Sequence, residues 1–267
     1  MHGVLLVDKP AGPTSHDVVH RVRRALGTKD AGHTGTLDPA ATGLLAICLG
    51  DALKLQRWLT EGDKAYLATI AFGASTTTED AEGTVLARGD PSGLTEAALR
   101  AALPALTGEI GPVGADGLRL VHLAVRCGKG TFVRTLAADL GRALGVPSHL
   151  CALRRTAAGP FGLDDALPLE DLERLAGADR PALLARIIHP AEAVAFFPTL
   201  PVDANGAIAL SRGRQLSFPG EADGLKRVIG PDGALVAVGE VLAGRLRPVR
   251  VITAPVVPPA PATPRRT

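Results

Sequence analysis

AGHTGTLDPAATG, residues 31–43, places a single acidic side chain among glycines, hydroxyls and alanines. The acid is Asp38; His33 precedes it by five residues and Pro39 follows it directly. Side chains this small bury little apolar surface, so the stretch is a poor candidate for a core strand or a core helix. We interpret it as a turn that leaves space around one carboxylate, a pattern more typical of a functional loop than of packing.

The composition indicates a globular protein. The chain has 267 residues, of which 46% are hydrophobic, enough for one large domain or for a large and a small one. The apolar run at residues 3–7 is followed by Asp8 and Lys9 and is too short for a signal peptide or a membrane span. Three cysteines without a C-x-x-C pair leave an odd thiol, which is typical of a reducing compartment. We therefore expect a cytoplasmic protein that does not enter a membrane.

The formal net charge of +2 does not by itself indicate nucleic acid. The distribution of charge is more informative, because basic residues gather at 21–29, 126–134 and 153–155, while acidic ones concentrate at 164–179. A basic surface results if the three basic segments meet in the fold.

Hydrophobic periodicity predicts helices and strands over residues 3–160. Thr14 and Asp17 have capping-box spacing ahead of a helical apolar stripe that stops at Gly27. Residues 64–73 alternate, which places Tyr66 at the start of a strand. Further strands are expected at 43–50, 84–87 and 118–127, and further helices at 51–62, 94–106 and 132–143. Short strands without regular crossover helices favour an α/β (α+β) fold with a mixed, largely antiparallel sheet and flanking helices.

The sequence changes character after Ala195. Short strand-like runs are separated by Asn-Gly at 205–206 and Asp-Gly at 232–233, with hardly a helix expected among them. This pattern predicts a small β-rich domain, a barrel or sandwich, over residues 197–254. The proline-rich end, residues 255–267, is expected to form a disordered tail.

Several signatures of common chemistry are missing from the sequence. It has no His/Cys cluster at zinc spacing, no P-loop, no dinucleotide-binding glycine motif and no nucleophile-elbow serine. These absences argue against a metal site, a nucleotide-cofactor site and a serine hydrolase. Asp38, with no second acid at close spacing, is left as a nucleophile or a base.

Five segments, taken in order, resemble the motifs of the TruB-type tRNA pseudouridine synthases. They are GVLLVDKPAGPTSHDVV, GTKDAGHTGTLDPAATGLL, DKAYLATIAFG with TTTEDAEG, CGKGTFVRTLAADLG and HLCALRRTAAG. The resemblance covers most of residues 3–160, and the β-rich end looks like the PUA-like, RNA-binding C-terminal domain of that family. It implies a catalytic domain over residues 1–195 and an RNA-binding domain over 197–254.

The resemblance implies an isomerase that converts uridine to pseudouridine at position 55 in the T loop of tRNA. The N-glycosidic bond is cut, and the uracil is turned and rejoined through carbon 5, without cofactor or metal. Asp38 would be the catalytic aspartate, and the small residues around it would leave room for a nucleotide flipped out of the RNA. The implied partner is the T stem-loop of tRNA, and we expect the protein to be a monomer.

The resemblance also implies roles for neighbouring residues. Arg134 matches the arginine paired with the catalytic carboxylate, and Tyr66 matches the tyrosine that stacks on the flipped uracil. His33 matches a histidine that enters the T loop as the base leaves. Lys9 and Pro10 fit a loop against the catalytic turn, where Lys9 either contacts phosphate or holds the turn.

Three further residues match less specific positions. Phe132 stands where the family usually has tyrosine, so stacking is kept and a hydroxyl is lost. Leu153 matches an apolar wall of the pocket, and Asp80 matches an acid whose role the sequence does not give. Each match has an ordinary alternative: Tyr66 as a half-buried strand residue, Arg134 as a solvated helix charge and Leu153 as a core leucine.

One departure from the family pattern is large. Between Ile110 and Leu118 the family normally carries a PPxxSAxK-like motif, a thumb-like RNA-contacting insertion and a further strand, where this chain has only GPVGADG. About forty residues are missing, well beyond ordinary loop variation. Two other functions therefore stay open: a non-catalytic tRNA-binding or tRNA-folding protein, and a nucleoside or glycoside hydrolase that uses Asp38 with a second carboxylate.

Overall fold

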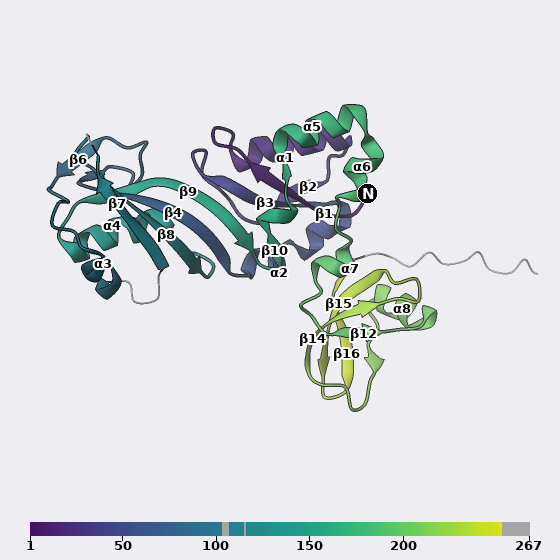
Figure 1. Ribbon diagram of the computed structural model, residues 1–267. Coiled ribbons are helices and arrows are strands. Elements are labelled where there is room, and N and C mark those ends of the chain that lie inside the picture. Colours follow the sequence, from purple (N-terminus) through teal and green to yellow (C-terminus); the bar gives the residue numbers. More distant parts are fainter. Residues whose placement is uncertain (103–106, 115, 253–267) are drawn as a thin grey trace, which may run out of the picture. The chain divides into compact units, whose positions relative to one another are not determined.

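The computed structural model describes residues 1–102, 107–114 and 116–252, drawn in Figure 1. The chain forms two compact units. The larger unit consists of residues 5–48 and 56–187, and the smaller one gathers residues 1–4, 49–55 and the chain from Ile188 onward. The proline-rich tail expected at 255–267 lies outside the described residues.

A nine-stranded mixed sheet organises the larger unit. Its strands run in the order β11-β1-β3-β9-β4-β8-β7, with β2 attached to β3 and β10 attached to β9. Strand β4 pairs antiparallel with β8 and β9, and β7 pairs antiparallel with β8, whereas the β3–β9 and β1–β11 pairs are parallel. The expectation of a mixed, largely antiparallel sheet is thereby confirmed. The strands are β1 (Gly3–Lys9), β2 (Ala31–His33), β3 (Thr42–Leu49), β4 (Lys64–Phe72), β7 (Thr107–Val113), β8 (Arg119–Cys127), β9 (Ser148–Ala158), β10 (Phe161–Gly162) and β11 (Leu167–Pro168).

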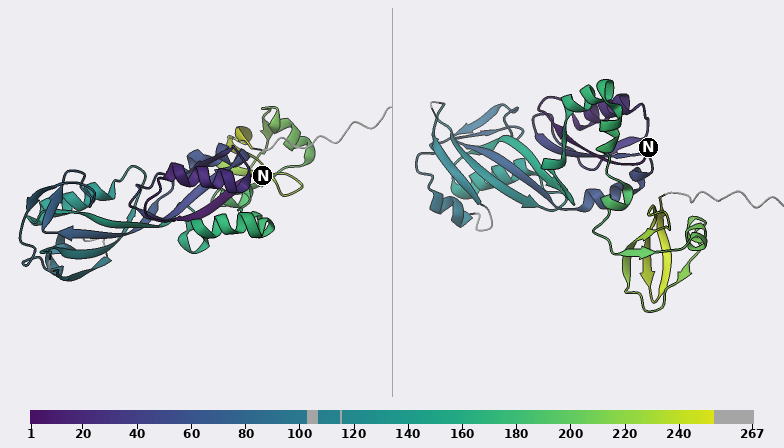
Figure 2. Two further views of the ribbon diagram at one scale, coloured as in Figure 1. Left: turned by 90° about the horizontal axis from the view of Figure 1, so that it is seen from above. Right: turned by 45° about the vertical axis from the view of Figure 1, so that its right-hand side comes forward.

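Helix α1 (Ser15–Leu26) begins and ends as its sequence predicts. The Thr14 hydroxyl accepts a hydrogen bond from the Asp17 amide at 3.1 Å, and the Asp17 carboxylate accepts one from the Thr14 amide at 2.9 Å. Gly27 ends the helix in the left-handed conformation, with φ 64°. Helix α5 (Leu169–Ala178) lies beside α1, as Figures 1 and 2 show.

Strand alternation builds the core of the larger unit between β4, β8 and helix α4 (Val133–Leu144). Ile70 and Phe72 of β4 pack with Val121 of β8 and with Ala137 and Leu140 of α4. Helix α3 (Glu96–Ala102) contributes Leu99 to the same core. The remaining elements of this unit are α2 (Gln56–Glu61), α6 (Arg180–Ala185), the 3-10 turn η2 (Leu163–Asp165) and the two-stranded sheet of β5 (Ala74–Thr76) and β6 (Val85–Arg88).

One expected helix differs from the structure, and another is described only in part. The helix expected at 51–62 divides into the 3-10 turn η1 (Gly50–Leu55) and the short helix α2. Of the helix expected at 94–106, the structure describes α3 (Glu96–Ala102); residues 103–106 lie outside the described part, and the chain is a β-strand from Thr107. Beyond that strand a tight turn, with the Gly114 amide donating to the Leu118 carbonyl at 2.7 Å, leads directly into β8. Strand β7 is therefore the last strand of the sheet on this side.

The smaller unit holds a five-stranded sheet in the order β12-β14-β15-β16-β13. Its strands are β12 (Thr199–Pro201), β13 (Leu216–Ser217), β14 (Gly224–Ile229), β15 (Leu235–Leu242) and β16 (Arg245–Val251), and α7 (Pro190–Ala193) precedes them. The Asp-Gly signal at 232–233 lies in the turn between β14 and β15, as expected. No described helix is long and apolar enough to cross a membrane.

The expectation of hardly a helix in this unit is wrong for α8 (Ala204–Ser211). The Asp203 carboxylate accepts a hydrogen bond from the Gly206 amide at 2.7 Å, so Asn205 and Gly206 form the first turn of a helix and not a hairpin. Ala207 and Leu210 then pack into the core of the unit. Capping and burial together outweigh the local turn preference of Asn-Gly.

Candidate active site

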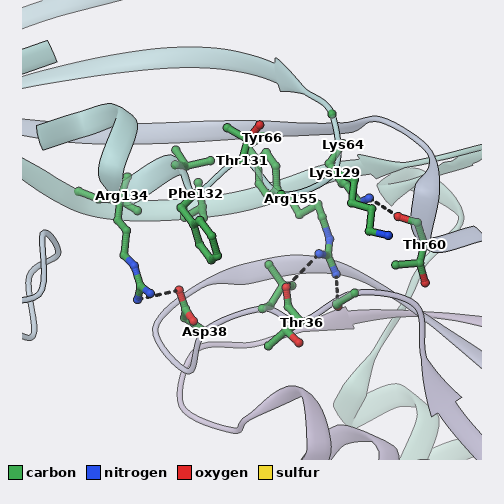
Figure 3. A pocket seen from close by; sticks show the side chains of 17 residues that line it. Thr36, Asp38, Thr60, Lys64, Tyr66, Lys129, Thr131, Phe132, Arg134 and Arg155 are labelled. Carbon is green, nitrogen blue, oxygen red and sulfur yellow. Dashed lines mark hydrogen bonds and ion pairs between the residues drawn. The ribbon is translucent and has the colours of Figure 1, made fainter. Parts of the chain in front are cut away.

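A cavity of about 450 Å³ lies in the larger unit, in the size range of small-molecule sites. Its walls come from the turn that contains Asp38, the start of β4, the strand β9 and the segment between β8 and α4, as Figure 3 shows. Five of the side chains predicted for the site line this cavity: Asp38, Tyr66, Phe132, Arg134 and Leu153. Segments that are far apart in the sequence are thus brought together.

Helix α1 anchors the turn through its first residue. The buried Ser15 hydroxyl donates to the Leu37 carbonyl at 3.0 Å and accepts from the Leu37 amide at 2.8 Å. The Ala41 amide donates to the Asp38 carbonyl at 3.1 Å and closes the turn on its other side. The backbone on both sides of the Asp38 carboxylate is therefore fixed, which is the preorganisation that catalysis needs.

Lys9 lies behind this turn and is fully buried. Its ammonium donates to the carbonyls of Pro10 (2.9 Å), Pro13 (2.8 Å) and Pro39 (3.0 Å). Burial lowers the pKa of Lys9 from its ordinary value, and the negative charge of Asp38 opposes that shift. Since all three ammonium protons are donated to carbonyls, the geometry favours the role of holding the turn over contact with phosphate.

The Asp38 carboxylate faces the Arg134 guanidinium across the mouth of the cavity. Arg134 Nη1 and Asp38 Oδ2 are 3.8 Å apart, and the two side chains are 38% and 56% exposed. Arg134 belongs to the first turn of α4, and its guanidinium carbon lies 5.7 Å from the centre of the Phe132 ring. An ion pair this open adds little to stability, so its position at the cavity suggests a role with a ligand.

Aromatic and apolar side chains complete the cavity. Phe132 is 63% exposed at its rim, although burial of such a ring is favoured. Tyr66 on β4 and Leu153 on β9 are half-buried. The three side chains offer a flat base both stacking partners and an apolar wall.

Besides Lys9, two predicted site residues do not line this cavity. His33 on β2 is half-buried; burial lowers its pKa, and its Nδ1 atom has no hydrogen-bond partner among the described residues. Asp80 lies beside a smaller neighbouring cavity that it shares with Asp38 and Leu153. The Asp80 carboxylate accepts hydrogen bonds from the Thr78 hydroxyl at 2.5 Å and the Glu82 amide at 3.1 Å, which fixes its own loop.

Two buried cations at the cavity were not singled out as site residues from the sequence. Arg155 is 2% exposed and lies two residues after Leu153 on β9. Lys64 is 9% exposed and donates to the carbonyls of Thr60 (2.5 Å) and Gly62 (2.7 Å). A signal for Arg155 was present, because residues two apart on a strand share a face.

The charge of the cavity wall is mainly positive. Lys64, Lys129, Arg134 and Arg155 line it, and Asp38 is the single acid among the described residues that do so. A cationic, partly aromatic cavity suits a phosphate-bearing nucleotide. Within the described ranges no group of three or more His, Cys, Asp or Glu side chains is placed to hold a metal ion.

This fold and this cavity, with one carboxylate among cations and aromatic rings, are typical of an enzyme that acts on a nucleotide. Three family models identify which one. "TruB family pseudouridylate synthase (N terminal domain)" matches residues 23–116, "tRNA pseudouridylate synthase B C-terminal domain" matches 134–195, and "tRNA Pseudouridine synthase II, C terminal" matches 197–253. The chain belongs to the TruB family of pseudouridylate synthases.

Curated relatives agree with this family. The chain is 41% identical to tRNA pseudouridine synthase B of Aromatoleum aromaticum, covering 94% of this chain and 92% of the relative. It is 38% identical to tRNA pseudouridine synthase B of a Mycobacterium species (strain KMS), covering 94% and 96%. The first alignment spans 291 residues, more than the 267 of this chain, so part of that relative has no counterpart here.

Solved structures share the fold. The archaeal box H/ACA sRNP Nop10–Cbf5 complex matches with a TM-score of 0.74 at 25% identity, covering 94% of this chain and 86% of that one. An H/ACA RNP bound to a substrate RNA that contains 2'-deoxyuridine matches with a TM-score of 0.75, also at 25% identity, covering 94% and 85%. Both confirm the pseudouridine-synthase-like fold expected from the sequence.

Proposed function

We propose that this protein converts uridine to pseudouridine at position 55 in the T loop of tRNA. The observation that carries the proposal is the placement of Asp38, the single acid among the described residues that line a cationic, aromatic cavity, with its Oδ2 atom 3.8 Å from Arg134 Nη1. The family and the curated relatives support the reaction and the tRNA substrate. The T-loop position rests on the five motifs.

The reaction is balanced within one nucleotide. The bond between C1′ and N1 breaks, a bond between C1′ and C5 forms, a proton leaves C5 and N1 ends with a proton. No atom is gained or lost, so one carboxylate that acts as nucleophile or base supplies what the protein must contribute chemically. Arg134 holds that carboxylate in the cavity while Tyr66 and Leu153 keep the detached uracil in place.

The cavity holds only a nucleotide that has left its stack. Extruding a uridine costs a few kcal/mol, and stacking on an aromatic ring returns part of it. Phe132, exposed at the rim, is placed to contact RNA as the base enters. Lys129, exposed on the segment before α4, is placed to contact a phosphate.

The two alternative functions receive less support. A hydrolase with two catalytic carboxylates needs a second acid about 5–10 Å from the first. Asp38 is the single acid among the described residues that line the large cavity. Asp80 and Glu82 line the smaller neighbouring cavity with Asp38, but the Asp80 carboxylate is already bonded to the Thr78 hydroxyl and the Glu82 amide within its own loop. A purely RNA-binding protein has no need for an exposed carboxylate in a cationic pocket, where it repels phosphate.

We assign residues 1–195 to a catalytic domain and residues 197–254 to a PUA-like RNA-binding domain. The match of a separate C-terminal family model to residues 197–253 supports this division. Exposed Arg245 and Arg250 on β16 offer contacts to phosphate. We further propose that the protein acts in the cytoplasm as a monomer.

Incubation with an unmodified tRNA transcript tests the reaction. Pseudouridine keeps the mass of uridine, so it is detected through a chemical adduct specific to one of the two bases and mapped along the RNA. We expect one modified position, 55, with no free uracil. Release of uracil would favour the hydrolase, and an unmodified transcript after long incubation would leave only the RNA-binding alternative.

A further inference from the structure

Arg155 is a buried cation that lacks an acidic partner. Its side chain is 2% exposed, and within the described part of the chain no carboxylate lies at ion-pair distance from it. Its sequence neighbour Arg154, in contrast, has an acidic partner: Arg154 Nη2 lies 2.6 Å from Asp8 Oδ2. A lone charge is strongly disfavoured in a protein interior unless hydrogen bonds replace its water.

Backbone carbonyls of the catalytic turn supply those hydrogen bonds. Arg155 Nε donates to the Leu44 carbonyl at 2.7 Å, and its two terminal nitrogens donate to the carbonyls of Thr36 (3.3 Å) and Gly35 (3.1 Å). Figure 3 shows the guanidinium pointing at this turn. One planar group thus joins strand β3 to the backbone two residues before Asp38.

The same guanidinium also interacts with Tyr66. Strand pairing places Tyr66 of β4 directly opposite Arg155 of β9. Burial lowers the pKa of Arg155, and the neighbouring Tyr66 side chain opposes that shift. Arg155 therefore donates to the turn that carries the Asp38 carboxylate and lies opposite Tyr66 at the same cavity.

We propose that Arg155 is a positioning residue that fixes the Asp38 turn and the Tyr66 ring relative to each other, through its hydrogen bonds to the Gly35 and Thr36 carbonyls and its contact with Tyr66. The inference rests on the proposed function. A lysine keeps the charge but has one nitrogen, so it cannot donate to the Leu44, Thr36 and Gly35 carbonyls in the same geometry. Lys9 holds the other side of the turn by the same means.

Kinetics on an unmodified tRNA transcript test this role with the full chain. The variants are Arg155→Lys, Tyr66→Phe, the double variant and the control Arg154→Lys, which changes the neighbouring arginine that bonds to Asp8 and Thr42. The readouts are the single-turnover rate at saturating enzyme, the Kd for tRNA and the thermal midpoint. A misplacement of about 1 Å costs about a hundredfold in rate, so we expect a loss of that order for Arg155→Lys with Kd within about threefold.

The double variant separates positioning from general loosening. If Arg155 acts through the Tyr66 hydroxyl, the double variant loses about as much rate as Arg155→Lys alone, because the two changes break one contact. Fully multiplicative losses, or a rate for Arg155→Lys equal to that of Arg154→Lys, would overturn the proposal.

Two further outcomes remain decisive. If Arg155→Lys does not fold, Tyr66→Phe alone carries the test: it keeps the ring, and an unchanged rate at saturation would contradict the inferred contact. If the wild type itself forms no pseudouridine, the proposed function is wrong. If the wild type and Arg155→Lys are equally active, only the inference about Arg155 is wrong.

Discussion

The ion pair between Arg134 and Asp38 contributes little to the stability of the fold. At 3.8 Å, with both side chains more than a third exposed, such a pair is worth about 0–1 kcal/mol in stability. The small residues around Asp38 leave the carboxylate accessible, and buried Ser15 and Lys9 hold its backbone from behind. The support of the turn therefore fixes its backbone and leaves the Asp38 carboxylate exposed.

Arg134→Ala is predicted to lower the rate of pseudouridine formation by about a hundredfold, as removal of one preorganised electrostatic partner commonly does. Urea unfolding should shift by no more than about 1 kcal/mol. Arg142→Ala is the matched control, because Arg142 lies on the same helix and pairs with Asp139 away from the cavity. Equal rates for the two variants would show that Arg134 does not act on Asp38.

The sequence motifs predict most of the residues that line the cavity. They do not predict the hydrogen bonds that hold each of these residues in place. Asp38, Tyr66 and Arg134 come from three segments, and only the fold brings them together. Arg155 was missed because a buried arginine is rare, and the carbonyls that compensate its charge belong to a turn more than a hundred residues away. Single-sequence patterns do not report such long-range hydrogen bonds.

At the scale of elements, Gly43 joins the catalytic turn to the sheet. A Cβ atom there would lie 2.3 Å from the Arg155 carbonyl oxygen, and φ is +100°. Strands β3 and β9 approach too closely at this point for any other residue. The close approach places β9, with Arg155 and Leu153, beside the turn.

Gly43→Ala is predicted to destabilise the protein by more than the roughly 1–3 kcal/mol that a strained φ alone costs. Gly12→Ala isolates the strain, because φ is +107° there and no atom lies within 4 Å of the added Cβ. Urea unfolding of both variants measures the difference. Similar destabilisation of the two would mean that β3 and β9 can separate without cost.

Element prediction was most successful where local chemistry and burial agree. Helix α1 follows its capping box and its apolar stripe from end to end. Helix α8 was missed because Asn-Gly favours a hairpin locally, whereas the Asp203 cap and the buried Leu210 favour a helix.

At the scale of the whole molecule, the smaller unit should contribute RNA affinity rather than chemistry. Replacing Arg245 and Arg250 together by glutamine should weaken tRNA binding and reduce the slope of log K against log salt, by about 0.7–0.9 for each phosphate that is no longer neutralised. The rate at saturation should stay the same. A control with equal charge change is Arg100→Gln with Arg174→Gln, whose arginines pair with Glu96 and Asp171. Identical salt slopes for the two double variants would show that this unit does not contact RNA.

The short connection between β7 and β8 should reduce affinity more than catalysis. Remote contacts to RNA offset the few kcal/mol needed to extrude a uridine, and the family resemblance implies a thumb-like segment where this chain has only GPVGADG. We expect a high half-saturation for tRNA, with tighter binding after a family-like segment is grafted in place of GPVGADG. If the wild-type chain already binds tRNA as tightly as the grafted chain, other surfaces of the protein provide the affinity.

The central claim is that the Asp38 carboxylate performs the isomerisation, and Asp38→Asn tests it most directly. The amide keeps the size of the side chain and removes its charge and basicity. With enzyme in excess over an unmodified tRNA transcript, wild type should form pseudouridine at position 55, whereas Asp38→Asn should form none while keeping its Kd for tRNA and its thermal midpoint. Appreciable pseudouridine formed by folded, tRNA-bound Asp38→Asn would contradict the account.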